Sequence, residues 1–177
     1  VVQKLGAVPQ NIPGGEVYTA LEKGTIDAAE WVGPYDDQKL GFNRVAPYYY
    51  YPGWWEGGPN VDLFVNQKAL AALPDEYKTI LEAASIYLHT NVQAKYDASN
   101  PAALKQLVAA KTKVLPFSQA IMEASYKASM EVFAENDAKS PEWRKIYADM
   151  RAFQRDEVLW FRFAEASFDG FMFRQKL

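Results

Sequence analysis

The sequence predicts an α/β fold in which a few short strands precede a long helical C-terminal region. Its character changes near residue 60: Gly, Pro and aromatic residues dominate before this point, and helix-forming residues dominate after it. After Pro74, apolar residues recur at intervals of three and four, which is typical of amphipathic helices. The few early strands cannot form a useful sheet by themselves. We therefore interpret the chain as the later part of an α/β protein, with an independent domain as the alternative.

Glycine, proline and asparagine set the limits of the predicted elements before Pro74. Residues 14–24 are predicted as a short helix, since two glycines precede it and Gly24 can adopt the left-handed C-cap conformation. The other elements predicted here are a strand at residues 25–31, a helix at 35–40, a strand at 45–51, a strand at 61–65 and a short helix capped by Asn66.

Helices separated by proline are predicted for the rest of the chain. The pair Asn100-Pro101 is expected to interrupt the first long helix, because the residue before a proline disfavours the helical region. Residues 102–111 form the next predicted helix, and residues 114–116 a short edge strand. Ser118 and Ser140 are predicted to cap two further helices. The inward face of the first of these is predicted to carry Ile121, Ala124, Ser125, Ala128 and Val132.

Composition and charge exclude several classes of partner and site. The net charge is -3 and the 19 basic residues are scattered, so we expect no nucleic acid partner. Apolar runs fall short of the roughly 20 residues that cross a bilayer. The chain has no cysteine, which excludes disulfides and thiolate metal sites. If the protein is exported, we expect its signal peptide to lie upstream of Val1.

Residues typical of catalysis are sparse. His89 is the single histidine, and its place inside a predicted helix favours an ordinary surface or half-buried side chain. The sequence has no Gly-x-Ser-x-Gly elbow and no glycine-rich phosphate loop. The acidic pair Asp36-Asp37 lies in a predicted exposed turn, where solvated carboxylates are expected.

Two short segments combine acids with tryptophan. Glu30-Trp31 and the segment at residues 52–56, which ends in Trp54, Trp55 and Glu56, each follow a predicted strand. In α/β sheets ligands bind at such carboxyl ends. Two carboxylates and a main-chain carbonyl suit a hard cation such as Ca²⁺ or Na⁺, and the cation would offset the charge of a bound carboxylate. The alternative is that Glu30 and Glu56 are ordinary surface acids.

Residues 14–31, GGEVYTALEKGTIDAAEW, resemble the GGEIYxALxxGxIDGxEW stretch of the solute-binding proteins of TRAP transporters, the DctP-type family. The similarity continues through residues 32–37 and through residues 48–54, YYYYPGW. These motifs are specific to the branch that binds 2-oxo acids and hydroxy acids such as lactate. The resemblance covers essentially the whole chain and is strongest at residues 12–66.

This resemblance implies a periplasmic-binding-protein-like receptor with two α/β lobes joined by hinge strands. It also implies a Na⁺ or Ca²⁺ ion that bridges protein and ligand. Glu30 would bind the cation through its side chain, and Trp31 through its main-chain carbonyl while its ring packs on the substrate. Glu56 would be the second acidic cation ligand. Tyr51 and Trp54 are expected to contact the substrate, although neighbouring strand tyrosines face opposite sides.

The resemblance implies that the N-terminal lobe of this fold is absent here. The family's carboxylate-binding arginine, which belongs upstream of Val1, is expected to be absent with it. Residues 1–60 are then expected to be part of the second α/β lobe with its hinge strand. Residues 61–177 are expected to hold a returning strand and the helical region.

The function that we expect is periplasmic capture of a small organic carboxylate and its delivery to the TRAP membrane permease, without catalysis. One alternative is a metal-dependent enzyme that acts on a 2-oxo acid. Another is a helical interaction module that docks through the aromatic tail, whose largest side chains are Phe168, Phe171 and Phe173. The same tail could join a homodimer through the C-terminal helix, or pack on its own core.

Overall fold

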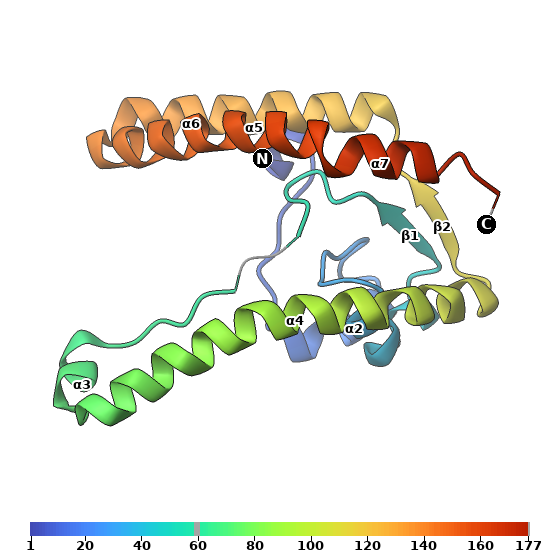
Figure 1. Ribbon diagram of the computed structural model, residues 1–177. Helices are drawn as coiled ribbons and strands as arrows, with labels where there is room; N and C mark the ends of the chain where they lie inside the picture. The colour runs from blue at the N-terminus through green and yellow to red at the C-terminus, as the bar shows by residue number, and fades with distance from the viewer. Residues whose placement is uncertain (59–60, 177) are drawn as a thin grey trace. The chain divides into compact units, whose positions relative to one another are not determined.

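The computed structural model describes residues 1–58 and 61–176, which form two compact units (Figure 1). One unit is Ala7–Glu123, and the other combines Val1–Gly6 with the residues from Ala124 onward. The fold is mostly helical with few strands, as expected for the later part of an α/β protein. The domain boundary predicted between residues 60 and 61 stays a prediction, because position 60 lies outside the described residues.

Short elements make up the first part of the unit Ala7–Glu123. In chain order the elements of this unit are η2 (Gly14–Glu16), α1 (Val17–Glu22), α2 (Pro34–Leu40), η3 (Phe42–Arg44), β1 (Tyr48–Tyr51), α3 (Gln67–Ala72), α4 (Asp75–Ala109) and β2 (Lys113–Pro116). The predicted short helices are confirmed in α1 and α2, and Gly24 has the expected left-handed φ of 67°. Asn66 caps α3 by accepting two backbone N–H groups.

The sheet of this unit has two parallel strands, β1 and β2, with Tyr48 opposite Lys113 (Figure 1). The predicted edge strand at residues 114–116 is therefore confirmed. β1 begins at Tyr48 and not at Val45, because the preceding residues turn into η3 and the Val45 N–H bonds to the Phe42 carbonyl. The long α4 connects the two strands, as parallel pairing requires.

Two predicted strands, at residues 25–31 and 61–65, are wrong. Neither segment pairs with β1 or β2, which pair with each other, and a strand needs a partner ladder to satisfy its backbone. The Thr25 N–H instead bonds to the Ala20 carbonyl at 2.9 Å, which continues the end of α1. Apolar composition is therefore not enough to form a strand, because among the described residues no strand lies beside either segment to pair with it.

The predicted break at Asn100-Pro101 is also wrong, since α4 continues through Pro101. Residues beyond the proline are anchored by burial: Ala103 and Leu107 are 4% and 1% exposed. Such packing offsets the single backbone hydrogen bond that proline cannot donate. The Asn100 side chain accepts the Tyr35 N–H at 3.0 Å, which ties α4 to the start of α2.

The other unit contains η1 (Val2–Leu5), most of α5 (Gln119–Lys139), α6 (Pro141–Phe163) and α7 (Glu165–Met172) (Figure 1). The predicted caps are confirmed, because Ser118 accepts the Ile121 N–H and Ser140 accepts the Trp143 N–H. Phe133 of α5 lies against Trp143 and Tyr147 of α6, with ring centroids 6.3 Å and 4.9 Å away. These aromatic contacts connect α5 with α6.

The apolar faces of these helices are more exposed than their periodicity predicts. Within α5, Ser125 and Ala128 are buried as expected and Val132 is half-buried, but Ala124 and Ile121 are exposed. Apolar side chains that recur at three and four along α6 are also exposed, among them Ile146 at 71% and Phe153 at 66%. In the part of the chain that the structure describes, no helix combines the length and apolarity needed to span a membrane.

Candidate functional site

Glu30 and Trp31 lie in an irregular segment between α1 and α2, not at the end of a strand. The Glu30 side chain is exposed. Trp31 is half-buried and its ring packs edge-on against Phe42 at a centroid distance of 5.6 Å. A Cβ atom at Gly14 would come within 2.6 Å of the same ring, so this glycine leaves the space that the indole occupies.

The second predicted segment directly follows β1, as expected. Tyr51 is half-exposed, and the peptide bond from Tyr51 to Pro52 is cis. Trp54 is half-buried and contacts Trp55 edge-to-face at 5.0 Å, while Glu56 is exposed. One tryptophan ring therefore shields the other from water, and the acid that follows stays accessible to a ligand.

The charge of Glu56 acts on Glu30, the other predicted acid. Partial withdrawal from water raises the pKa of Glu30, and the negative charges of Glu56 and Asp37 raise it further. Glu30 and Glu56 are far apart in the polypeptide but near enough for one carboxylate to disfavour ionisation of the other. A hard cation at this place would relieve the repulsion that these charges create.

The donor set fits such a cation only in part. Among residues 1–58 and 61–176, no three Asp, Glu or His side chains gather closely enough to form a metal site by themselves. Glu30, Glu56 and the main-chain carbonyl of Trp31 are all oxygen donors, the type preferred by Ca²⁺, which takes about 6–8 of them. The remaining donors would have to come from a ligand, water or further protein.

The prediction for Asp37 is wrong. It was expected in an exposed turn, but it is 7% exposed and accepts hydrogen bonds from two loop amides and from Tyr49. Asp36, its neighbour, is half-buried. The signal that could have identified Asp37 is its place in the first turn of a helix begun by Gly33-Pro34, where acids fold back onto free N–H groups.

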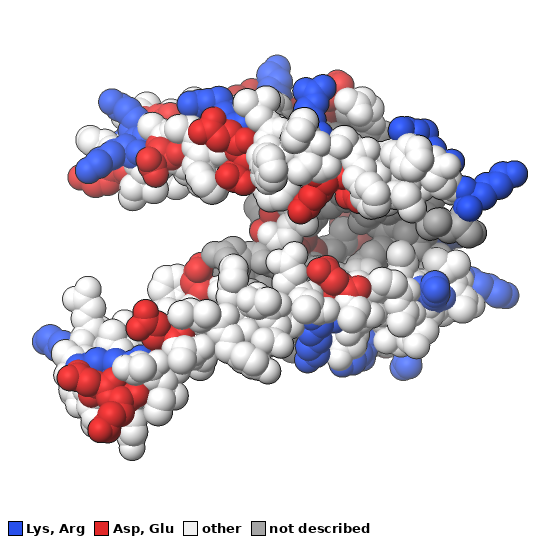
Figure 2. All heavy atoms as spheres, in the orientation of Figure 1, with Lys and Arg blue, Asp and Glu red and all other residues white. Residues whose placement is uncertain are grey.

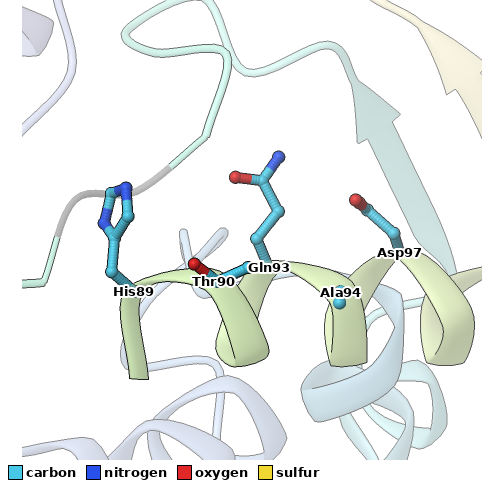
Figure 3. A pocket seen from close by; sticks show the side chains of 5 residues that line it. All are labelled: His89, Thr90, Gln93, Ala94 and Asp97. Atoms are coloured by element: carbon cyan, nitrogen blue, oxygen red, sulfur yellow. The ribbon is translucent and has the colours of Figure 1, made fainter. Parts of the chain in front are cut away.

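His89 is exposed, as expected for a surface helix position. It lines an open depression whose walls come from α4 alone, and Figure 3 shows His89, Gln93 and Asp97 projecting from the same side of that helix. The depression includes none of the predicted site residues. It therefore adds nothing to the candidate site.

Charged side chains are mixed in sign over the visible face in Figure 2, where Lys and Arg alternate with Asp and Glu. Among the described residues on that face, no basic stripe follows any one element. The scattering expected from the sequence is therefore seen in three dimensions on this side of each unit.

Comparisons with known proteins identify relatives of this chain. A monocarboxylate 2-oxoacid-binding periplasmic protein from Nostoc sp. (strain PCC 7120) is 46% identical over 171 residues, which are 97% of this chain and 47% of the relative. The crystal structure of a TRAP transporter solute-binding protein from Bordetella bronchiseptica RB50 is 50% identical with a TM-score of 0.90, covering 97% of this chain and 51% of that one. That structure is described as a dimer with copurified calcium and picolinate.

A third relative is the TRAP periplasmic solute-binding protein from Pseudoalteromonas atlantica T6c, described with bound sodium and pyruvate. It is 39% identical with a TM-score of 0.87, and the match covers 94% of this chain and 51% of that one. This chain thus spans about half the length of these relatives. The model of the bacterial extracellular solute-binding proteins of family 7, DctP, matches residues 1–139, and the chain belongs to this family.

Proposed function

We propose that this chain is part of the solute-binding receptor of a TRAP transporter. The receptor captures a small organic carboxylate, a 2-oxo acid or hydroxy acid, together with a bridging Na⁺ or Ca²⁺, and delivers it to the membrane permease. The observation that carries this proposal is the match of residues 1–139 to the DctP family of solute-binding proteins, in which Glu30 and Glu56 stand in the motifs predicted to bind the cation. The relatives described with calcium and picolinate, or with sodium and pyruvate, support the choice of ligand.

Charge balance explains why a cation is needed. A carboxylate ligand placed near Glu30 and Glu56 would add a third negative charge to a place where the pKa of Glu30 is already raised. When bound, the cation supplies the positive charge that all three carboxylates require. Glu30, Glu56 and the Trp31 carbonyl provide three oxygen donors, which leaves about three or more positions of a Ca²⁺ shell for ligand and water.

Aromatic side chains would complete the site. Trp31, already held by Phe42 and by the space at Gly14, offers a fixed ring edge for a small ligand. Trp54 and Tyr51 would exclude water from the bound ligand. Capture of this kind makes and breaks no covalent bond, so we propose a receptor and not an enzyme.

We also propose that the receptor acts in the periplasm, because the Nostoc relative is named a periplasmic protein. A homodimer through the C-terminal helix stays a separate proposal. Its basis is that Phe168 and Phe171 of α7 are 63% and 55% exposed and that the Bordetella relative is described as a dimer.

Thermal unfolding of the 177-residue chain tests the proposal. The midpoint should rise when Ca²⁺ or Na⁺ is present together with pyruvate or lactate, because a ligand that binds the folded state stabilises it by mass action. At a ligand concentration of 100 times Kd the gain is about 2.7 kcal/mol. Glu30→Gln and Glu56→Gln should abolish the rise.

Glu22→Gln is the matched control, since Glu22 is an exposed acid at the end of α1 and should leave the rise intact. If the chain unfolds cooperatively but gains no stability from cation and acid together, the rest of the receptor is needed for binding, and the same measurement on the full-length protein then decides: no gain there would overturn the proposal. A rise that the acid produces without any cation, unchanged in Glu30→Gln, would overturn the bridging role.

A further inference from the structure

A single buried carboxylate, that of Asp37, connects the two segments that carry the acids. One of its oxygens accepts the N–H of Val32 at 3.4 Å and the N–H of Gly33 at 3.3 Å. The other accepts the hydroxyl of Tyr49 at 2.6 Å. Val32 and Gly33 directly follow Glu30-Trp31, and Tyr49 lies in β1, which leads into the segment that ends at Glu56.

The segment that carries Glu30 and Trp31 belongs to no helix or strand. Residues 25–33 form neither helix nor strand, so their backbone N–H groups need partners from elsewhere. The bonds to Val32 and Gly33 are long, but both end on an ionised acceptor, which strengthens a hydrogen bond. The Asp37 backbone adds to them, since its own N–H bonds to the Gly33 carbonyl at 2.9 Å.

Tyr49 makes the burial of this charge tolerable. Burial raises the pKa of Asp37, while the bond from the Tyr49 hydroxyl and those from the two amides lower it. Burial and the Asp37 carboxylate together raise the pKa of Tyr49 far above its usual value, so the hydroxyl keeps its proton and donates. The bond at 2.6 Å has the length of a charge-assisted O–H to carboxylate bond.

We infer that Asp37 and Tyr49 are positioning residues: they hold the Glu30-Trp31 loop against β1, so that the oxygen donors of the two segments face one cation. This inference rests on the proposed function and adds two residues to it. The competing explanation is that Asp37 acts through its charge alone, because that charge also raises the pKa of Glu30. The two explanations predict different behaviour for neutral variants.

Four variants of the 177-residue chain separate these explanations. Asp37→Ala removes every bond, and Tyr49→Phe removes the hydroxyl bond and leaves the charge. Asp37→Asn removes the charge but keeps an acceptor oxygen for the amides, and its NH₂ group can donate to the Tyr49 oxygen. The control is Tyr50→Phe, which removes a hydroxyl from the adjacent residue of β1, an exposed tyrosine stacked on Phe117.

Two measurements are made on each variant. Hydrogen exchange of the Val32 and Gly33 amides, without added cation, reports the position of the loop. Titration with Ca²⁺ alone by calorimetry reports the cation site. We expect Tyr49→Phe to speed exchange and weaken Ca²⁺ binding by about tenfold, the size of one lost bond to a charged group. Asp37→Ala, which removes three bonds, should have at least as large an effect on both. Asp37→Asn should stay within about threefold of the parent in both, and Tyr50→Phe should match it.

The inference is overturned if Asp37→Asn loses as much Ca²⁺ affinity as Asp37→Ala while Tyr49→Phe keeps it, which is the pattern of a pure charge effect. It is also overturned if exchange at Val32 and Gly33 is unchanged in both Tyr49→Phe and Asp37→Ala. Should Asp37→Ala fail to fold, Tyr49→Phe and Asp37→Asn still separate position from charge. Should the parent chain not bind Ca²⁺, the titrations are made on the full-length protein, where failure to bind would count against the proposed function. The exchange data would still decide the role of Asp37.

Discussion

The segment from Glu30 to Glu56 and the helices α6 and α7 differ in how they are held. The first has only short elements, α2, η3 and β1, joined by loops, yet Trp31, Asp37 and Tyr49 each have a specific partner within the unit Ala7–Glu123. The second is almost wholly helical, yet many of its apolar side chains face solvent. Helices can form from local propensity and capping, whereas a binding site needs partners that are distant in the sequence.

Gly14→Ala should have the largest effect, because it attacks the contact that holds Trp31. The new Cβ would lie 2.6 Å from the ring, so the indole or the backbone must shift. We expect a loss of about 2–3 kcal/mol in the free energy of unfolding, as for other overpacked sites. Urea unfolding and the indole N–H resonance of Trp31 would measure it.

Gly15→Ala is the control for that substitution, since nothing lies within 4 Å of its added Cβ. Equal destabilisation by the two variants would mean that the backbone of η2, and not the Trp31 contact, is the sensitive feature.

Asn100→Ala should have the next largest effect. It leaves the Tyr35 N–H without the acceptor that now lies at 3.0 Å, at the start of the helix that carries Asp37. An unsatisfied donor of this kind costs about 1–2 kcal/mol. Thermal unfolding and exchange of the Tyr35 amide would detect it.

Asn91→Ala tests whether that loss is specific to the contact between α4 and α2. The Asn91 side chain bonds only to the Tyr87 carbonyl on the exposed surface of α4, so its removal should change stability by less than about 0.5 kcal/mol. If Asn91→Ala proved the more costly variant, the hydrogen bond between Asn100 and the Tyr35 N–H would not be a significant source of stability.

Ser140→Ala should have a smaller effect, confined to the helical unit. Its hydroxyl accepts the Trp143 N–H at 3.1 Å, and loss of such a cap costs about 1 kcal/mol. Helix content by circular dichroism and urea unfolding would measure this change. Ser167→Ala, which removes a hydroxyl that bonds locally to the carbonyls of Phe163 and Ala164, is the matched control. A change in the Trp31 resonance of Ser140→Ala would contradict the separation of the two regions.

Lys4→Gln should have the smallest effect. Lys4 pairs on the surface with Glu131 at 3.2 Å and Glu135 at 2.7 Å, and its hydrogen bond lowers the pKa of Glu135. A carboxyl whose pKa is lowered by folding adds stability above its unfolded pKa and loses it as the pH falls through the folded value. The variant should therefore have a slightly lower thermal midpoint at neutral pH, but not in acid.

High salt should remove this difference between Lys4→Gln and the parent, because exposed charges are screened. A difference that persists at about 1 M salt would indicate packing of the lysine stem instead of charge.

The helices were predictable because their signals are local. Asn66, Ser118 and Ser140 each accept N–H groups two or three residues ahead, so a short window contains the whole interaction. The strands at residues 25–31 and 61–65 were not predictable in this way, because a strand depends on a neighbour that the sequence pattern does not contain.

The predicted cation donors, Glu30 and Glu56, stay a prediction, and the buried Asp37 near them was not predicted. Glu30 and Glu56 stood out because each acid adjoins tryptophan and glycine or proline in a motif typical of the family. Asp37 did not stand out, because nothing in the residues around it reveals that a tyrosine of β1 covers it.

The sequence by itself determined the helix caps and the family, since these depend on neighbouring residues and on motifs. Only the tertiary structure decided the continuity of α4 through Pro101 and the burial of Asp37 beneath Tyr49. The physical reason is distance along the chain: Asp37 and Tyr49 are 12 residues apart and Tyr35 and Asn100 are 65 apart. Burial and hydrogen bonding over such separations arise only when the whole unit folds, and they then outweigh local preference.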